Sequence, residues 1–331
     1  MRLPMSNCAM TITCTILWNT LPLCEWEARF HKIQKSNFLQ SYSYAKGASR
    51  FYRQKARWGL IMIDDKEAGL VQVMEAGVLF NLIHGVIIDR GPLWFDGFGG
   101  AFHIQAFIKA LQKDFPKRWG RKHRFLLEIE DSPSAKALIK QTGLTFLPSR
   151  EPYETYWLDL SQDMDSLRAN LEGKWRNALR KAENFEENKK ISIDWDKKGL
   201  FYPLFKAQYA IEKQEHGYGG ISPQFLDILA PFLLEEGNMM IGVASVNNEL
   251  IASIMMIKHG QSATYQIGWT SDEGRSHNAH HLLLWQGACV LKQWGVKTLD
   301  LGGINHDTAA SIKKFKQGMG GMPYRLVGHY S

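Results

Sequence analysis

The chain of 331 residues is 45% hydrophobic and 22% charged, and it carries a formal net charge of +7. This balance is typical of a folded globular protein that is long enough for two ordinary domains. No uninterrupted apolar run reaches the length of a membrane span. The basic charge favours polyanionic partners, namely phosphorylated sugars, anionic lipid surfaces or RNA, and is equally compatible with a solvated surface that binds nothing.

The four cysteines indicate the compartment. They show neither a disulfide framework nor the paired spacing of a metal site, so we expect a reducing cytoplasm and no bound metal. Residues 8–24 are mildly apolar but contain several threonines, and little positive charge precedes them. We therefore expect a ragged start and a first strand there rather than a signal peptide.

The first half of the chain predicts strands that alternate with helices. The expected elements are a strand pair over residues 58–73 with a turn at Asp64-Asp65-Lys66, a strand over 84–94, a helix over 101–115, a strand over 125–130, a helix from Pro133 and a strand over 153–160. A glycine-rich loop over residues 95–100 precedes the helix over 101–115. We place the domain junction near Ser161, which gives domains 1–160 and 161–331.

The second half repeats this order of elements. The expected elements are a long helix over residues 165–184, a strand over 191–195, a helix over 201–216, a strand pair over 240–245 and 250–259, a strand over 263–270, a polar loop over 271–278, a helix over 279–294 and a short strand over 298–301. Strand, loop, helix, strand is the order of the acyl-donor half of an N-acyltransferase domain of the GNAT type. Its occurrence in both halves predicts an α/β protein of two tandem GNAT-like domains, with mixed sheets flanked by helices.

Four phrases resemble the Fem-type aminoacyltransferases, which share the GNAT-like fold. They are SNFLQSYSYAK over residues 36–46, Arg90-Gly91-Pro92 with an aromatic residue behind it, WRNALRKA over 175–182, and DLGGI over 300–304 followed by Phe315-Lys316 and a glycine turn. The resemblance covers most of the chain and is more specific from Trp157 onward. The long coiled-coil arm of some Fem proteins is absent.

The resemblance implies several substrate-binding residues in this chain. Lys46 is the best-placed equivalent of a lysine that contacts substrate phosphate, with Arg50 or Arg53 as alternatives. Asp96 lies near the place of an acidic residue of the acceptor site. Gln214 and Tyr218 stand where peptidoglycan-precursor enzymes have an arginine and an aromatic residue. Because glutamine carries no charge, this departure weakens the expectation of a bound nucleotide-diphosphate sugar.

Phe315, Lys316 and Tyr265 are the candidate catalytic residues. Acyl transfer to an amine needs a neutral amine, a stabilised tetrahedral oxyanion and a protonated leaving group, and a cation with backbone donors supplies much of this without a serine or cysteine nucleophile. The resemblance implies that the Phe315-Lys316 pair stabilises the reacting carbonyl. Tyr265, on the strand over residues 263–270, is expected to position the amine or relay a proton. A solvated lysine and a core tyrosine remain the alternatives.

The loop over residues 271–278 bears on the acyl donor. Coenzyme A enzymes usually have a basic, glycine-spaced loop here that holds the pyrophosphate at a helix N-terminus. In this chain Gly274 is the only glycine and follows Asp272 and Glu273, so Arg275 is the one cation left as a candidate for substrate binding. The loop therefore disfavours acyl-CoA and is compatible with aminoacyl-tRNA. The nearby histidines, His277, His280 and His281, are expected to be ordinary polar helix residues and not metal ligands.

The leading hypothesis is a Fem-like enzyme that moves an aminoacyl group from aminoacyl-tRNA to an amine of a peptidoglycan precursor. It would act in the cytoplasm, with peripheral contact to the inner membrane face as a possible feature, and would need no cofactor. The second hypothesis is a GNAT-type N-acyltransferase that uses coenzyme A or a carrier protein as donor and a sugar or lipid amine as acceptor. The third is a non-catalytic, basic binding protein with the same fold.

Overall fold

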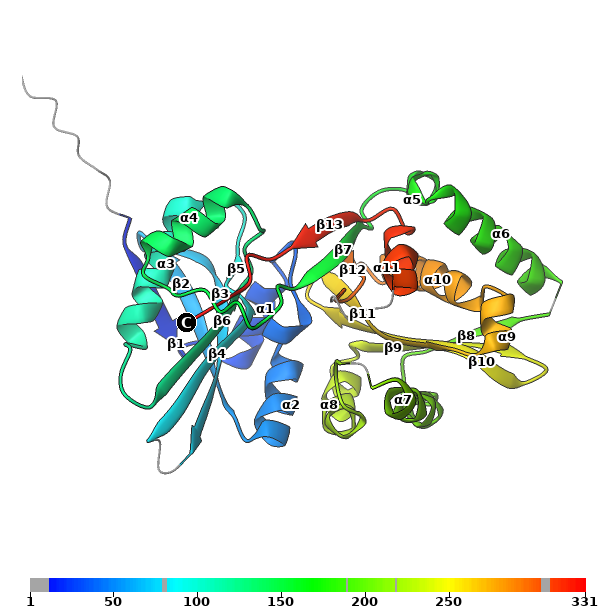
Figure 1. Cartoon of the computed structure of the whole chain (residues 1–331), viewed down its shortest axis with the longest axis horizontal. Coiled ribbons are helices and arrows are strands. Elements are labelled where there is room, and N and C mark those ends of the chain that lie inside the picture. The colour runs from blue at the N-terminus through cyan, green and yellow to red at the C-terminus, as the bar shows by residue number, and fades with distance from the viewer. Residues whose placement is uncertain (1–11, 79–81, 189, 218, 305–309) are drawn as a thin grey trace, which may run out of the picture.

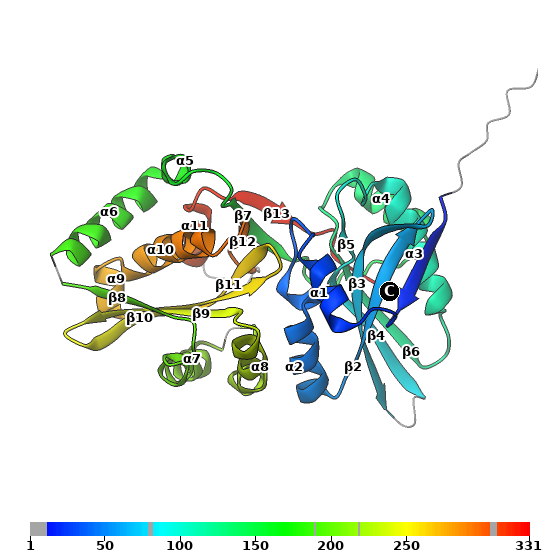
Figure 2. The ribbon, with the colours of Figure 1, turned by 180° about the vertical axis from the view of Figure 1, so that it is seen from behind.

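Two mixed sheets form the framework of the protein. The computed structural model describes residues 12–78, 82–188, 190–217, 219–304 and 310–331. Within these ranges the two sheets lie side by side along the long axis of the molecule, each with helices packed against it (Figures 1 and 2). The arrangement agrees with the α/β class that the alternating strands and helices predict.

The first sheet has seven strands within the described ranges, in the order β1-β2-β3-β4-β6-β14, with β5 paired to β3. Its strands are β1 Cys14–Trp18, β2 Lys55–Ile63, β3 Lys66–Val78, β4 Ile83–Gly91, β5 Leu93–Trp94, β6 Arg121–Leu127 and β14 His329–Tyr330. Only the β4–β6 pair is parallel among these described neighbours. The β2–β3 hairpin turns at Asp64 and Asp65, which both have positive φ, as the sequence predicts.

The second sheet also has seven strands in the described part of the chain, in the order β13-β7-β12-β11-β10-β9-β8. Its strands are β7 Glu154–Asp159, β8 Ser192–Asp196, β9 Met239–Val246, β10 Glu249–His259, β11 Ser262–Thr270, β12 Thr298–Asp300 and β13 Met322–Arg325. Strands β11 and β12 run parallel, and the chain between them forms helix α10 (Ala279–Gln293). The predicted strand pair over 240–245 and 250–259 is confirmed as β9 and β10.

Helices cover both faces of the first sheet. They are α1 Leu23–Phe30, the short 3-10 helix η1 Phe38–Gln40, α2 Tyr42–Tyr52, α3 Ala101–Asp114 and α4 Pro133–Gln141. Apolar side chains of α3 and α4, such as Phe107 and Ile139, share one core with β2, β3 and β4. Trp26 and Phe30 of α1 pack with Leu60 and Leu70, which belong to a separate cluster.

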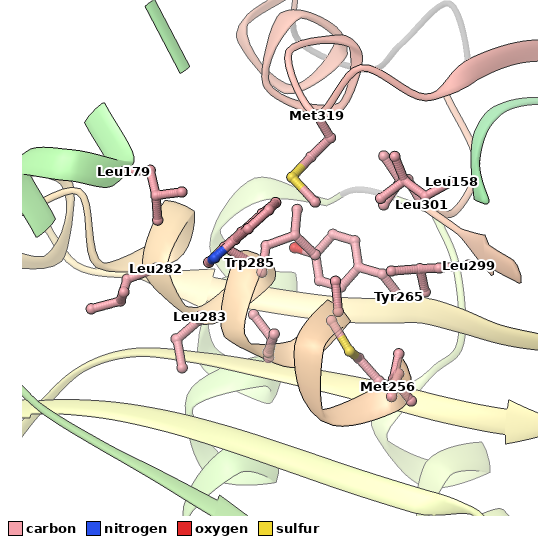
Figure 3. Packing of buried hydrophobic residues seen from close by; sticks show 14 of the residues in the cluster. Leu158, Leu179, Met256, Tyr265, Leu282, Leu283, Trp285, Leu299, Leu301 and Met319 are labelled. Atoms are coloured by element: carbon pink, nitrogen blue, oxygen red, sulfur yellow. The ribbon is translucent and has the colours of Figure 1, made fainter. Parts of the chain in front are cut away.

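Helices also cover both faces of the second sheet. They are α5 Met164–Asn170, α6 Gly173–Glu187, α7 Tyr202–His216, α8 Pro223–Glu235, α9 Asp272–Ser276, α10 and α11 Ala310–Gln317. In both views α5, α6, α10 and α11 lie on one side of this sheet and α7 and α8 on the other (Figures 1 and 2). Figure 3 shows the core under α10, where Tyr265 of β11 lies among side chains such as Leu283, Trp285 and Leu299.

Two local expectations for the second half were wrong. The single helix expected over residues 165–184 is broken into α5 and α6, because Leu171 leaves the helical conformation (φ −59°, ψ 137°) and buries its side chain in the core. The polar loop expected over residues 271–278 contains the short helix α9. The Ser271 hydroxyl caps this helix by accepting a hydrogen bond from the Gly274 N–H at 3.0 Å.

The chain crosses between the two sheets twice, once more than a division at residue 160 implies. Strand β7 pairs with β12 and β13 inside the second sheet. The C-terminus returns to the first sheet, where β14 pairs with β6, and it lies among the strands of that sheet in both views (Figures 1 and 2). We therefore propose a division by sheets, in which the second unit begins before β7 and residues 326–331 belong to the first.

Candidate active site

The candidate catalytic residues border a cavity in the second unit, between β11, α10, α11 and the start of α6. Its volume is about 1310 Å³, and it brings together three predicted site residues, Lys316, Phe315 and Tyr265, with Arg275 on its border. Trp175, His280 and His281 also line this cavity. Strand β11, helix α10 and the Phe-Lys pair thus converge on one cavity.

Lys316 is a buried cation with a constrained head group. Helix α11 ends one residue after it, and its side chain is only 8% exposed. Its Nζ donates to the carbonyl oxygens of Gly302 at 3.1 Å and Gly303 at 3.0 Å. Burial lowers the pKa of Lys316 to about 8, and the nearby charge of Asp300 opposes this decrease. Among the described residues these two hydrogen bonds leave the third N–H for a ligand in the cavity.

The carbonyl groups that hold Lys316 depend on a glycine. Gly302 has a φ of 76°, in the left-handed region. A Cβ atom at this position would lie 2.6 Å from the Tyr265 carbonyl oxygen and 3.3 Å from Lys316 Nζ. A side chain would therefore strain the backbone and push into the cation. This requirement explains in physical terms why the first glycine of the DLGGI phrase cannot carry a side chain.

Tyr265 and His280 form a hydrogen-bonded pair beside the cation. The Tyr265 hydroxyl lies 2.7 Å from His280 Nε2, and Lys316 Nζ lies 5.6 Å from the centre of the Tyr265 ring. Burial, with smaller contributions from His281 and Lys316, lowers the pKa of His280 to about 3. His280 is therefore a neutral imidazole at neutral pH, and it orients the tyrosine hydroxyl without adding charge.

Phe315 joins the helices that surround the cavity. Its ring centre lies 6.0 Å from that of Trp175, 5.2 Å from that of His280 and 4.9 Å from that of His281. These contacts connect α11 to both α6 and α10. Phe315 therefore fixes the helix that carries Lys316, and it lines the cavity with an apolar ring.

Arg275 borders the same cavity but is engaged by its own helix. Its guanidinium contacts Asp272 Oδ1 at 2.5 Å and donates to the Thr270 carbonyl at 2.8 Å. Asp272 and Glu273 occupy the first turn of α9. A negatively charged pyrophosphate would meet these two carboxylates, and the expectation that the segment disfavours acyl-CoA stays a prediction.

The remaining predicted binding residues lie away from this cavity. Lys46 is exposed on α2, with its Nζ 5.6 Å from the centre of the Tyr42 ring. Gln214 is exposed on α7. Asp96 lines a separate cavity of about 300 Å³ and accepts a hydrogen bond from Gln34 at 3.0 Å. Tyr218 lies outside the described residues. The roles of these four residues stay predictions.

Sequence reasoning missed the part that His280 plays. The histidines at the start of α10 were expected to be ordinary polar residues, yet burial lowers the pKa of both His280 and His281 and both line the cavity. The one feature of the sequence that could have indicated this role is that the two histidines stand on the helix that follows the strand of Tyr265. No group of three possible metal ligands occurs among the residues that the structure describes.

Comparison with known proteins places this site in a recognised fold. Residues 166–317 match the family described as an acetyltransferase (GNAT) domain. The comparison with curated proteins by sequence finds no match. No helix in the described ranges is both long and apolar enough to cross a membrane.

Solved structures match nearly the whole chain. The crystal structure of FemX is similar with a TM-score of 0.76 and 14% identity, over 95% of this chain and 96% of that chain. A tandem GNAT protein from the clavulanic acid biosynthesis pathway is similar with a TM-score of 0.53 and 12% identity, over 96% and 97% of the two chains. The C-terminal domain of a putative lysylphosphatidylglycerol synthetase from Agrobacterium fabrum gives 0.51 and 11%, over 93% and 91%.

These matches confirm the expected fold, a tandem GNAT-like α/β architecture that resembles the Fem type. The GNAT match and the fold also confirm the expected enzyme class, an acyltransferase.

Proposed function

We propose that this acyltransferase moves an aminoacyl group from aminoacyl-tRNA to an amine of a cell-wall precursor, with the acyl group held beside Lys316. The observation that carries the proposal is the state of Lys316 itself. It is a buried ammonium group with two N–H groups fixed on glycine carbonyls, and it faces a cavity large enough for a substrate end. Such a preorganised cation stabilises charge that develops on a reacting carbonyl oxygen.

The chemistry is a substitution at an ester carbonyl. The acceptor nitrogen attacks the carbonyl carbon, a C–N bond forms, and the C–O bond to the donor's ribose breaks. The nitrogen loses a proton and the ribose oxygen gains one, so no net proton is produced. Lys316 opposes the negative charge on the tetrahedral intermediate, and a pKa of about 8 leaves it mostly protonated at neutral pH. Tyr265 is our candidate for positioning the amine or relaying the proton.

The charges around the cavity support an aminoacyl-tRNA donor. Lys174 and Lys314 line the cavity and are exposed, and Arg180 and Lys181 extend the basic surface along α6. Exposed cations of this kind bind a phosphate backbone. Two carboxylates, Glu172 and Glu212, also line the cavity, and an aminoacyl ester carries a positive α-ammonium group that acetyl-CoA lacks.

The acceptor proposal is supported mainly by the resemblance to Fem-type enzymes. Asp96 borders the smaller, separate cavity of the first unit and is the candidate acidic residue for binding the acceptor. Lys46 is the candidate phosphate contact. One similar structure is a domain of a putative lysylphosphatidylglycerol synthetase. For this reason the proposal includes a lipid-bound acceptor and contact with the inner membrane face.

A second candidate function is N-acyl transfer from coenzyme A or an acyl carrier to a sugar or lipid amine. The match of residues 166–317 to an acetyltransferase domain favours it. The acidic first turn of α9 weighs against it, because Asp272 and Glu273 oppose a pyrophosphate.

The test offers both donors to the same protein. Radiolabelled amino acids on a charged bacterial tRNA pool and labelled acetyl-CoA are each supplied with lipid-linked cell-wall precursor. We expect label on the precursor only with charged tRNA, lost in Lys316→Ala and retained in Lys313→Ala, which removes an exposed lysine of the same helix. Transfer only from acetyl-CoA would replace the proposal with the second candidate.

A further inference from the structure

A buried ion pair joins the two sheets close to the active site. Arg90, at the end of β4, is 3% exposed, and Asp300, at the end of β12, is fully buried. Arg90 donates from Nη1 to Asp300 Oδ2 at 2.7 Å and makes two further hydrogen bonds to Glu128, at 2.9 and 3.1 Å. The guanidinium is thereby shared between a carboxylate of the first unit and one of the second. Two of the four phrases that resemble the Fem type, RGP and DLGGI, each contribute one partner to this pair.

Asp300 receives three more hydrogen bonds from its own unit. The hydroxyl groups of Tyr153 and Thr155 donate to it at 3.0 and 2.5 Å, and the Gly302 N–H donates at 2.9 Å. Burial favours the protonated carboxyl, but the charge of Arg90 and the hydrogen bonds outweigh it and keep the pKa of Asp300 below its usual value. Asp300 is therefore a carboxylate that is held from both sides.

The loop after Asp300 connects it to Lys316. The Gly302 N–H donates a hydrogen bond to the Asp300 carboxylate. The Gly302 carbonyl accepts from Lys316, and Thr155 Oγ1 lies 3.0 Å from the same oxygen. The contacts thus run without interruption from Arg90 through Asp300 and Gly302 to the ammonium group.

We infer that Asp300 is a positioning residue for Lys316, and that Arg90 of the first unit fixes Asp300 in this role. The carboxylate holds the glycine loop whose carbonyl groups aim the ammonium into the cavity. It also supplies the negative charge that favours the protonated lysine. The effect of Asp300 on catalysis rests on the proposed function, in which Lys316 stabilises the oxyanion. The positioning of Lys316 by Asp300 does not depend on that function.

A purely structural ion pair is the competing explanation, and the surroundings of Lys316 separate the two. The groups that act on the ammonium are Asp300 from β12, Tyr265 from β11 and the neutral His280 from α10. His281 lines the same cavity and is also neutral. Among the described residues, Asp300 is the carboxylate whose charge acts on the lysine. Loss of that charge makes Lys316 easier to deprotonate, whereas loss of a merely structural contact changes only the stability of the fold.

The test measures Lys316 directly and needs no substrate. Acetic anhydride labels neutral amines, so the pH dependence of Lys316 acetylation, followed by peptide mass spectrometry with exposed Lys313 as internal reference, reports its protonation. We expect Asp300→Asn to move the labelling midpoint of Lys316 down by about one pH unit. Thr155→Val, which keeps the ion pair and loosens the glycine loop, should raise the labelling rate. The matched control is Tyr153→Phe, which loses one hydrogen bond to Asp300 but leaves Gly302 in place.

A Lys316 labelling profile that is unchanged in folded Asp300→Asn and Thr155→Val, with only the melting temperature lowered, would overturn the inference. If Asp300→Asn does not fold, Thr155→Val decides alone. In the transfer assay the same variants should lower kcat more than they raise KM. Altered labelling with no transfer by the wild type from either donor would reject the proposed function and keep the positioning role.

Discussion

Lys316 is a charged residue in a buried position, and burial destabilises its protonated form. Its pKa falls from 10.5 to about 8, which corresponds to a cost of about 3 kcal/mol in folding free energy at pH 7. Between about pH 8 and the ordinary pKa of lysine, the unfolded chain binds more protons than the folded one. The stability contributed by this group is therefore lowest below pH 8 and rises with pH through that window.

Replacement of Lys316 by methionine should separate stability from activity. We expect Lys316→Met to lose transfer while it is at least as stable as the wild type at pH 7, and to lack the gain in stability between pH 8 and 10. Urea unfolding at both pH values checks this, with the exposed Lys313→Met as control. A variant several kcal/mol less stable at pH 7 would show that the two glycine carbonyls contribute more than the buried charge costs.

The same pKa predicts the pH dependence of catalysis. Because the protonated lysine is the form that opposes the oxyanion, kcat should fall as pH rises through about 8. Single-turnover rates avoid the hydrolysis of the donor ester at alkaline pH. Lys316→Arg should be slower at pH 7 but should lose this alkaline limb, since guanidinium stays charged. If kcat of the arginine variant still falls as pH rises through about 8, a group other than Lys316 causes the decrease.

Gly268 should matter because it leaves room for the Tyr265–His280 pair. A Cβ at Gly268 would lie 2.0 Å from the Tyr265 hydroxyl and 2.6 Å from His280 Cε1. We therefore expect Gly268→Ala to match Tyr265→Phe, with a fall in kcat of about a hundredfold if the hydroxyl relays a proton. Single-turnover transfer measures it. Gly85→Ala on β4 of the first unit, where a Cβ would make only ordinary contact with Ala76 at 3.7 Å, is the control.

At the scale of elements, α6 and α11 present the basic surface proposed for tRNA. Lys174 lies at the start of α6 and Lys314 on α11, and both line the cavity. Each phosphate contact that is lost should make the salt dependence of binding less steep by about one unit in a plot of log K against log salt concentration.

We expect Lys174→Glu and Lys314→Glu each to raise the KM for charged tRNA several-fold with little change in kcat. Filter binding across a range of salt concentrations gives the slope. Lys109→Glu, an exposed lysine on α3 of the first unit, should leave both values unchanged. Equal effects of all three substitutions would indicate nonspecific attraction by net charge.

At the scale of the whole molecule, the end of the chain completes the first sheet. Leu326, Val327 and Tyr330 are buried, and Val327 and Tyr330 belong to the core under α3. A chain that ends at Arg325 should lose about 5 kcal/mol of stability in the first unit, given the usual contribution of buried apolar side chains. Hydrogen exchange should show β6 opening, whereas Tyr330→Phe keeps the ring and should retain protection. Unchanged protection of β6 in the truncated chain would contradict this.

Much of the fold follows from local patterns. Alternation identified β2, β3, β9 and β10, and the glycine at position 295 marked the end of α10, because strand and helix periodicity depend on neighbouring residues alone. The pattern over residues 165–184 predicted one helix and was wrong. An apolar stripe continues through Leu171, but this residue leaves the helical conformation and enters the core. Phe315 and Lys316 were identified because they stand beside the glycine turn in a phrase that resembles a known family.

The sequence by itself therefore determined most of the elements, the tandem GNAT-like order and the choice of Phe315 and Lys316 as the candidate catalytic pair. Only the tertiary structure decided that Arg90 meets Asp300, 210 residues away, that His280 meets Tyr265, and that Lys46 and Gln214 lie outside the large cavity. Local patterns specify which face of an element is apolar. Burial, pKa and partners depend on which faces meet, and that is set by packing across the whole chain.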